Sequence, residues 1–427
     1  MPAPLPAPMP PPSLARGAAV NLAARLVTVA LGLAILFLVA RRGPAVQGAF
    51  ALFVAFESLL LTLFSGLGLL LARQVSHHGV RPGPLLMALL GAALALGTAA
   101  AVPLLGAAAL IDAEPYRHLG LLAMAAPFLL LVPTASGLWL GQGRMGALNA
   151  PLVAAPLAVL ALLLWFTDGE LAGVLAVLVA WVVGKSLVGV ATALVAARQT
   201  GWADAERDTL RAQWRFVAVI GLTNAVSLLN YRATLFLLER TVGLAEAGVY
   251  SVAVQVAELL WLLSTAVTVS AYHRIGAPDA LQAAHTTLRA VRINVLATLA
   301  AAPLLYLAAS ALLPRALGDA YDGALLPLAL LLPGIAGYAA ASSLSAYYTN
   351  HRGRPQWSAA IAAVSLALTL AIAAWSVPRF GAAGAALATS LAYTASIALA
   401  LTWFMRDTGL PWTSLLGIDA ARQSPPT

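Results

Sequence analysis

Long apolar runs, separated only by short polar or turn-rich segments, make up almost the whole chain. A run of about 18 or more apolar residues can cross the hydrocarbon layer of a bilayer as a helix, and a helix satisfies its own backbone hydrogen bonds there. Of the 427 residues 61% are apolar and only 9% are charged, whereas a soluble domain is about half apolar and about a quarter charged. The sequence therefore predicts an all-α polytopic membrane protein and excludes a soluble enzyme. The twelve runs lie near residues 17–40, 47–71, 85–110, 119–140, 147–166, 171–197, 213–238, 246–271, 287–313, 324–347, 356–377 and 382–405.

Side chains that carry chemistry are scarce. The chain has no cysteine, so it forms neither disulfides nor thiolate metal sites. Its six histidines lie in or near predicted loops and lack the spacing of metal ligands. We therefore expect no metal, no cofactor and no catalytic residue. Residues 1–16 are expected to be a disordered proline-rich tail without a cleavable signal peptide, and residues 406–427 a second tail.

The 24 basic residues, all arginine except Lys185, give a net charge of +8. With the N-terminus placed in the cytoplasm, 15 of them fall in inside segments and 6 in outside loops. This bias follows the positive-inside rule and predicts that both tails are cytoplasmic. Because topology accounts for most of the charge, we do not expect nucleic acid as a partner. The inside residues are Arg16, Arg73, Arg81, Arg144, Arg198, Arg207, Arg211, Arg215, Arg274, Arg289, Arg292, Arg352, Arg354, Arg406 and Arg422; the outside residues are Arg41, Arg42, Arg117, Arg240, Arg315 and Arg379.

Short matches at a nearly constant offset indicate an internal duplication. The segment Gly-Ala-Phe at 48–50 corresponds to Gly-Val-Tyr at 248–250, and Pro-Leu-Leu at 103–105 recurs at 303–305. We therefore predict two six-helix bundles, at residues 17–197 and 213–405, in parallel orientation around a central cavity. The polar linker 198–212 is expected to form an amphipathic cytoplasmic helix at the membrane interface, which serves either as a solvated connector or as a regulatory contact.

Five ionisable residues lie inside predicted spans: Arg25, Glu57, Lys185, Arg232 and Glu258. Each costs on the order of 3 kcal/mol at the centre of a membrane helix, unless pairing or water relieves it. One interpretation is that Arg25 pairs with Glu57, and Arg232 with Glu258, to lock neighbouring helices. The other is that these charges line a substrate pathway between the halves. As a point charge on a flexible stem, Lys185 suits a phosphate.

Polar and aromatic residues accompany two of these charges. Asn224, Asn230 and Tyr231 make the seventh span polar beside Arg232, which favours a cavity wall. The eighth span carries a stripe at helical spacing, a pattern more typical of a packing surface than of a binding site. The stripe consists of Tyr250, Val254, Glu258, Trp261 and Thr265.

Three segments of the second half resemble a known family. Residues 248–253 (GVYSVA), 258–261 (ELLW) and 272–275 (YHRI) are similar to the eighth-helix region of bacterial Wzx-type polysaccharide flippases. Tyr272 and His273 stand where that family commonly has a proline. Residues 49–52, 66–68 and Arg73 resemble the matching N-terminal element, and residues 381–388 (GAAGAALA) resemble the last helix. The resemblance covers most of residues 17–406.

The resemblance implies the superfamily of multidrug, oligosaccharidyl-lipid and polysaccharide exporters, whose two bundles enclose a cavity that opens alternately to each side. For a Wzx-type member it implies an undecaprenyl-diphosphate-linked oligosaccharide as cargo, moved across the bacterial inner membrane for polysaccharide biosynthesis. Membrane lipids, a polysaccharide polymerase and chain-length machinery are the other partners it implies.

On the physical argument, Arg25, Lys185 and Arg232 are the candidate cargo-binding residues, and Arg73 is placed at the cytoplasmic entrance. Glu57 and Glu258 are expected to balance charge or to carry a coupling ion. Two alternatives stay open. A multidrug cation antiporter would share the fold but favour an acidic cavity, whereas three bases face two acids here. A membrane glycosyltransferase would need acidic residues in the first outside loop, and residues 41–47 contain none.

Overall fold

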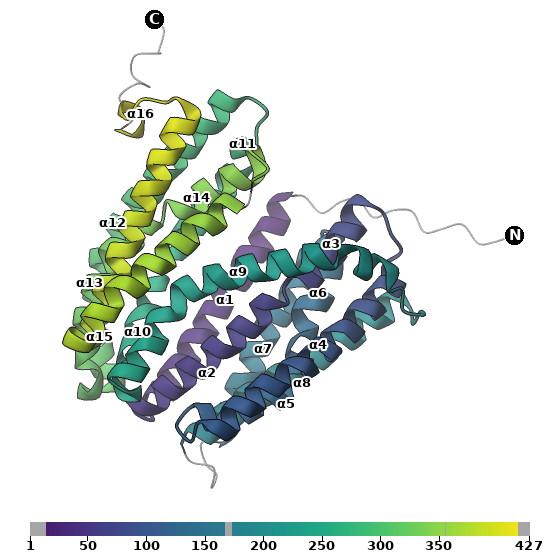
Figure 1. The fold of residues 1–427 in the computed structure, drawn as a ribbon, viewed down its shortest axis with the longest axis horizontal. Helices are drawn as coiled ribbons and strands as arrows, with labels where there is room; N and C mark the ends of the chain where they lie inside the picture. Colours follow the sequence, from purple (N-terminus) through teal and green to yellow (C-terminus); the bar gives the residue numbers. More distant parts are fainter. Residues whose placement is uncertain (1–13, 167–172, 355, 417–427) are drawn as a thin grey trace, which may run out of the picture. The chain divides into compact units, whose positions relative to one another are not determined.

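The computed structural model describes residues 14–166, 173–354 and 356–416, and within these ranges the chain is helical and has no strand (Figure 1). Eleven helical segments of this described part are long and apolar enough to cross a membrane. The predicted all-α, multi-pass fold is confirmed. Residues 1–13 and 417–427 of the two predicted tails lie outside the described residues. The helices are α1 (Leu14–Ala40), α2 (Pro44–Leu63), α3 (Gly66–His77), α4 (Pro82–Leu110), η1 (Tyr116–His118), α5 (Leu119–Leu129), α6 (Leu131–Gly141), α7 (Met145–Trp165), α8 (Val174–Thr200), α9 (Asp208–Thr241), α10 (Leu244–Glu258), α11 (Trp261–Ile275), α12 (Ala280–Leu317), η3 (Asp319–Ala324), α13 (Leu325–Tyr338), α14 (Ala341–Ala346), the π-helical turn η4 (Tyr347–His351), α15 (Gln356–Thr408) and α16 (Thr413–Leu416).

The eleventh and twelfth predicted spans are joined in α15. Gly381 separates them, with φ of 54° and ψ of −132°, a conformation that is open to glycine and strained for other residues. The backbone N–H of Ala382 donates to Oε1 of Glu246 at 3.0 Å, so a carboxylate from the first turn of α10 caps the helix that follows. Eleven helical segments of the described part therefore contain the twelve predicted spans, because α15 contains two of them.

Four of the spans are broken helices, and the breaks recur in both halves of the sequence. The second span breaks between α2 and α3 at residues 64–65, and the eighth between α10 and α11 at residues 259–260. The fourth span breaks between α5 and α6 at residue 130, and the tenth between α13 and α14 at residues 339–340. Pro133 contributes to the break at 130, because it has no N–H to bond the carbonyl of Leu129. The recurrence supports the predicted duplication.

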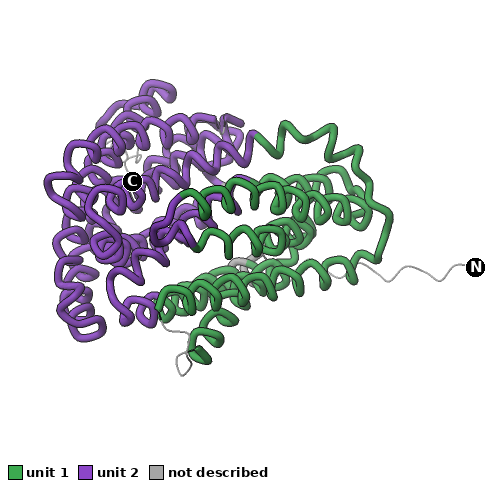
Figure 2. The backbone as a smooth tube through the Cα atoms, turned by 60° about the horizontal axis from the view of Figure 1, so that its bottom comes forward, with its two compact units in different colours: residues 1–35, 64–110, 118–218 green, residues 36–63, 111–117, 219–427 purple. Residues whose placement is uncertain are grey.

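The described chain forms two compact units (Figure 2). Unit 1 comprises residues 1–35, 64–110 and 118–218, and unit 2 comprises residues 36–63, 111–117 and 219–427. Unit 1 contains the packed pairs α3 with α6, α4 with α5 and α7 with α8, whereas in unit 2 α13 packs on α15 and α11 on α12 (Figure 1). α2 is assigned to unit 2, although its sequence belongs to the first predicted half. The predicted boundaries of the two halves, at 197 and 213, stay a prediction.

The linker between the halves is not the amphipathic helix that the sequence predicts, because a non-helical segment separates α8 from α9. α8 ends at Thr200, because the φ of 77° at Gly201 stops the helix, and residues 201–207 are not helical. The backbone N–H of Glu206 donates to the carbonyl of Pro84 at 3.0 Å. Its carboxylate accepts from the backbone N–H of Thr209 at 2.9 Å, which fixes the start of α9. The backbone conformation of Gly201 and the capping carboxylate of Glu206 therefore keep this segment out of a helix, although its composition would allow one.

In unit 2, helices α2 and α10 cross at two glycines, Gly48 and Gly248. A Cβ added to Gly248 would lie 1.9 Å from the carbonyl oxygen of Pro44, and one added to Gly48 would lie 2.0 Å from that of Leu244. Exchanging each residue for its counterpart 200 positions away converts one contact into the other, and 200 residues is the offset of the sequence repeat. A two-fold relation between the two helices produces such reciprocal contacts. Small residues allow membrane helices to approach this closely. The packing of these two helices in unit 2 supports the predicted duplication.

Candidate functional site

The six predicted site residues are divided between the two units. Arg25 on α1, Arg73 on α3 and Lys185 on α8 belong to unit 1. Glu57 on α2, Arg232 on α9 and Glu258 on α10 belong to unit 2. Three of the four predicted cargo-binding bases thus lie in one unit, and both predicted acids lie in the other.

Arg232 and Glu258 form a two-pronged ion pair. Nη1 of Arg232 donates to Oε1 of Glu258 at 3.0 Å, and Nη2 donates to Oε2 at 3.2 Å. The two side chains are 29% and 20% exposed, so the pair is largely enclosed by protein. Glu258 is the last residue of α10, where the negative end of a helix disfavours a carboxylate, and the guanidinium offsets this. The predicted pairing of these two residues is confirmed, and it neutralises the one candidate base of unit 2.

This pair should behave as a coupled unit in a double-mutant cycle. We expect Arg232→Ala to destabilise the protein by on the order of 3 kcal/mol, because it leaves Glu258 uncompensated in a low-dielectric environment. The double variant Arg232→Ala/Glu258→Ala should be more stable than Arg232→Ala alone. Thermal unfolding of the purified variants in detergent measures both effects, and strictly additive losses would contradict the coupling.

Two of the three candidate bases of unit 1 lie beside aromatic rings, and the third is exposed. Arg25 is exposed on α1. The guanidinium of Arg73 lies 5.1 Å from the ring centre of Phe216, and the ammonium of Lys185 lies 4.5 Å from that of Trp181. A cation–π contact orients a base without cancelling its charge. Within a membrane span, such bases normally face a water-filled pathway rather than lipid.

Glu57 is enclosed within the protein, with only 1% of its surface exposed. It lies on α2, nine residues beyond Gly48 in the helix that crosses α10. Arg25 belongs to the other unit, so the predicted pairing of Arg25 with Glu57 stays a prediction.

A cavity of about 330 Å³ lies within unit 2, at the lower end of the range usual for small-molecule sites. Its wall combines aromatic rings with hydroxyl groups, and none of its lining residues is charged. Tyr231 lines it, as the polar character of the seventh span predicts, and so do Trp261 and Thr265 of the stripe that we interpreted as packing surface. The aromatic residues are Tyr231, Trp261, Tyr338, Tyr348, Trp357 and Trp403. The serines and threonine are Ser227, Ser264, Thr265, Ser342, Ser345 and Ser358.

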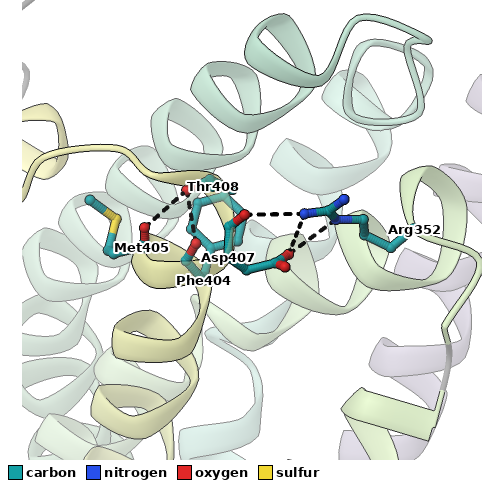
Figure 3. Close-up of polar contacts among 5 residues, drawn as sticks. All are labelled: Arg352, Phe404, Met405, Asp407 and Thr408. Atoms are coloured by element: carbon teal, nitrogen blue, oxygen red, sulfur yellow. Dashed lines mark hydrogen bonds and ion pairs between the residues drawn. The ribbon is translucent and has the colours of Figure 1, made fainter.

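An ion pair holds the segment next to this cavity. Nε and Nη2 of Arg352 donate to Oδ2 of Asp407 at 3.0 and 2.7 Å, and Nη2 also donates to the backbone carbonyl of Asp407 at 3.2 Å (Figure 3). These hydrogen bonds raise the pKa of Arg352 above its ordinary value. The pair connects the chain just after η4, which carries Tyr348, to the end of α15, which carries Trp403. Because both side chains are about one third exposed, its contribution to stability is about 1 kcal/mol or less.

No protein-family model matches the sequence, and no curated protein matches it either. Solved structures do share its architecture. The lipid II flippase MurJ in an inward closed conformation aligns with a TM-score of 0.77 at 13% identity, over 94% of this chain and 90% of that one. A multidrug resistance MATE family transporter of the MOP superfamily in an inward-facing conformation aligns at 0.74 with 17% identity, over 92% and 98%. A MOP superfamily transporter from Pyrococcus furiosus, described as having a binding pocket of reverse polarity, aligns at 0.68 with 16% identity, over 92% and 95%.

The chain therefore has the fold of the MOP superfamily transporters, which include a lipid II flippase and MATE multidrug transporters. It is a multi-pass membrane protein by its fold and by its eleven membrane-spanning candidates in the described part. The three solved structures compared above are described as two transporters and a flippase.

The cavity is the feature that sequence analysis missed. Its aromatic residues come from α9, α11, α13, η4 and α15, and they are separated by up to 172 positions, from Tyr231 to Trp403. Only the polar start of the seventh span and the stripe on the eighth gave a local signal. Charged residues in the sequence do not reveal such a site, because no residue of its wall is charged.

Proposed function

We propose that the chain is an alternating-access transporter that moves an undecaprenyl-diphosphate-linked oligosaccharide from the inner to the outer side of the bacterial cytoplasmic membrane. The observation that supports this most strongly is the placement of Arg25, Arg73 and Lys185 in unit 1, while the base of unit 2 is neutralised by Glu258. Three bases on the helices of one unit suit an anionic headgroup, and a diphosphate is the anion that this class of lipid carries. The fold, shared with a lipid II flippase, is compatible with such a cargo.

In the proposed mechanism the diphosphate enters from the cytoplasm and meets Arg73 first. Arg25 and Lys185 then hold it, while the polyprenyl chain stays in the lipid and the glycan enters the protein. Movement of the two bundles exposes the cargo to the other side. No bond is made or broken, so the protein supplies only binding, shielding from lipid and conformational change. Both termini are placed in the cytoplasm by the charge bias of the loops.

A multidrug antiporter is the second candidate, because MATE transporters share the fold and the aromatic cavity of unit 2 offers ring faces to an organic cation. The bases of unit 1 weigh against it, since they repel a cationic cargo. The two candidate functions thus predict opposite charges on the cargo near Lys185. A flippase brings a negative diphosphate to it, whereas a multidrug antiporter carries a positive cargo.

Lys185 offers a direct test, because it is the only lysine in the chain. The purified full-length protein is treated with an amine-reactive ester, and modification of Lys185 is followed by mass spectrometry. We expect undecaprenyl-diphosphate oligosaccharide to slow the modification several-fold, and ethidium to leave it unchanged. Protection by ethidium alone would favour the antiporter, and no protection by either would contradict the assignment of Lys185. The N-terminal amine serves as the internal control for reagent activity.

A further inference from the structure

We propose that the cavity of unit 2 is a binding site for a neutral sugar ring. This inference rests on the proposed function for its natural ligand, the glycan of the lipid-linked cargo, and it assigns that glycan to residues other than the bases that hold the diphosphate. The proposal is based on the aromatic and hydroxyl residues of the cavity wall.

The aromatic residues form an inner and an outer group. The inner group contains Tyr231, Trp261 and Tyr338; the ring centres of Tyr231 and Trp261 are 5.1 Å apart, and those of Tyr231 and Tyr338 are 6.0 Å apart. The outer group contains Trp357, Trp403 and Tyr348, with the rings of Trp357 and Trp403 4.5 Å apart. On the predicted topology, the outer group lies towards the cytoplasmic ends of its helices, near Arg352 and Arg406. Tryptophans in that position are common as interfacial anchors, but the inner group lies deeper along α9 and α11 and needs another explanation.

Six serine and threonine residues share the cavity wall with these rings. A pyranose has apolar C–H faces, which pack against the electron-rich faces of aromatic rings, and a rim of hydroxyls, which donate and accept hydrogen bonds. A site for it needs rings and small polar side chains together and no net charge, which is the composition of this wall. An acyl chain would offer no hydrogen bond to Oγ of Ser264, which has no partner in the described structure.

Three of the lining residues carry a buried polar atom without a hydrogen-bond partner in the described structure: Nε1 of Trp261, Oγ of Ser264 and the hydroxyl of Tyr348. Buried polar groups are rarely left unpaired in folded proteins. A change of side-chain rotamer would let them bond the hydroxyls of a ligand in the cavity. A tetraalkylammonium cation provides no acceptor for the indole N–H of Trp261, whereas a sugar hydroxyl does.

The charges around the site also favour a neutral ligand. Tyr231 is adjacent in sequence to Arg232, the charged residue next to the inner group, and Glu258 neutralises Arg232 through two hydrogen bonds. No lining residue offers a carboxylate to a cation or a free base to an anion. The cavity therefore complements the part of a lipid-linked oligosaccharide that carries no charge.

Fluorine NMR of the full-length protein labelled with 5-fluorotryptophan tests this site in detergent. Each resonance is assigned by substitution, and glucose, galactose, N-acetylglucosamine and rhamnose are titrated to millimolar concentrations. We expect at least one sugar to shift the resonances of Trp261, Trp357 and Trp403. Trp375 lies on the same helix as Trp357 but outside the cavity, and its resonance should not move. Trp357→Ala should abolish the shifts at Trp261 and Trp403, whereas Trp357→Phe should retain them.

Absence of a shift with all four sugars would overturn the site. Larger shifts with tetraethylammonium than with any sugar would show that it binds organic cations instead. A second measurement keeps this inference separate from the proposed function. In proteoliposomes, Trp357→Ala/Trp403→Ala should slow the movement of the glycan-bearing lipid about ten-fold more than that of bare undecaprenyl diphosphate, with Trp375→Ala as the control. Equal slowing of the two lipids would contradict the sugar site while leaving transport intact, and sugar-induced shifts without any lipid movement would contradict transport alone.

Discussion

Replacement of Gly248 by leucine is expected to prevent the protein from folding stably, although no charge, cavity residue or site residue is altered. A side chain at this position would meet the carbonyl oxygen of Pro44, 1.9 Å from its Cβ, where α10 crosses α2. Overpacking against movable side chains costs about 1–3 kcal/mol, and a helix carbonyl cannot rotate away. We therefore expect a loss of more than about 3 kcal/mol, measured as the thermal midpoint and the yield of monodisperse protein in detergent.

The symmetry of the crossing provides a second variant, and an open position provides a control. Gly48→Leu should be as severe as Gly248→Leu, because its Cβ would lie 2.0 Å from the carbonyl oxygen of Leu244. Gly337→Ala, in α13 of the same unit, should be almost neutral, since its nearest neighbour is 3.9 Å away. Normal folding of both leucine variants would show that α2 and α10 do not cross at these glycines.

The second large effect is expected from the bases of unit 1. Arg25→Ala/Lys185→Ala should lower cargo transport at least ten-fold while the protein still folds, because each charge-assisted contact with a diphosphate contributes about 1.5–3 kcal/mol. The rate of glycan-lipid movement in proteoliposomes measures this, and the thermal midpoint in detergent reports the fold. Arg25 and Lys185 make a better pair for this test than Arg25 and Arg232, because removal of Arg232 also leaves Glu258 unpaired.

Conservative and distant variants separate charge from bulk. Arg25→Lys/Lys185→Arg should restore most of the transport, since both bases remain at membrane depth. Arg315→Ala removes a base from the exposed end of α12, where its guanidinium contacts the backbone carbonyl of Ala311, and it should have no effect. Unchanged transport in Arg25→Ala/Lys185→Ala would remove both residues from the candidate site.

Much of the fold is predictable because lipid restricts the chain to helices whose lengths can be read directly. The stop between the last two spans was predicted, and Gly381 provides it. The repeat offset of 200 residues identified the positions of Gly48 and Gly248, although only the structure shows that these two glycines face each other. The linker was harder, because one backbone conformation, at Gly201, decides against a helix that composition allows.

The site was only partly predictable, for a related reason. Charges within apolar spans are conspicuous, so the pair of Arg232 and Glu258 could be proposed from the sequence alone. Neutral aromatic and hydroxyl residues are common in membrane helices, and they gain meaning only when several helices place them around one cavity. Trp261 illustrates this: its spacing indicated packing, and the structure places it beside Tyr231 and Ser264 in the cavity wall.

Transport itself can be measured with the purified full-length protein in proteoliposomes. Fluorescent undecaprenyl-diphosphate oligosaccharide is placed in both leaflets, and a membrane-impermeant reagent destroys the label on the outer one. We expect the wild-type protein to bring the inner-leaflet label to the surface many-fold faster than protein-free liposomes do, so that nearly all fluorescence is lost. Persistence of the inner-leaflet fraction at the protein-free level, in vesicles that do expel ethidium, would contradict the proposed cargo and favour a multidrug transporter.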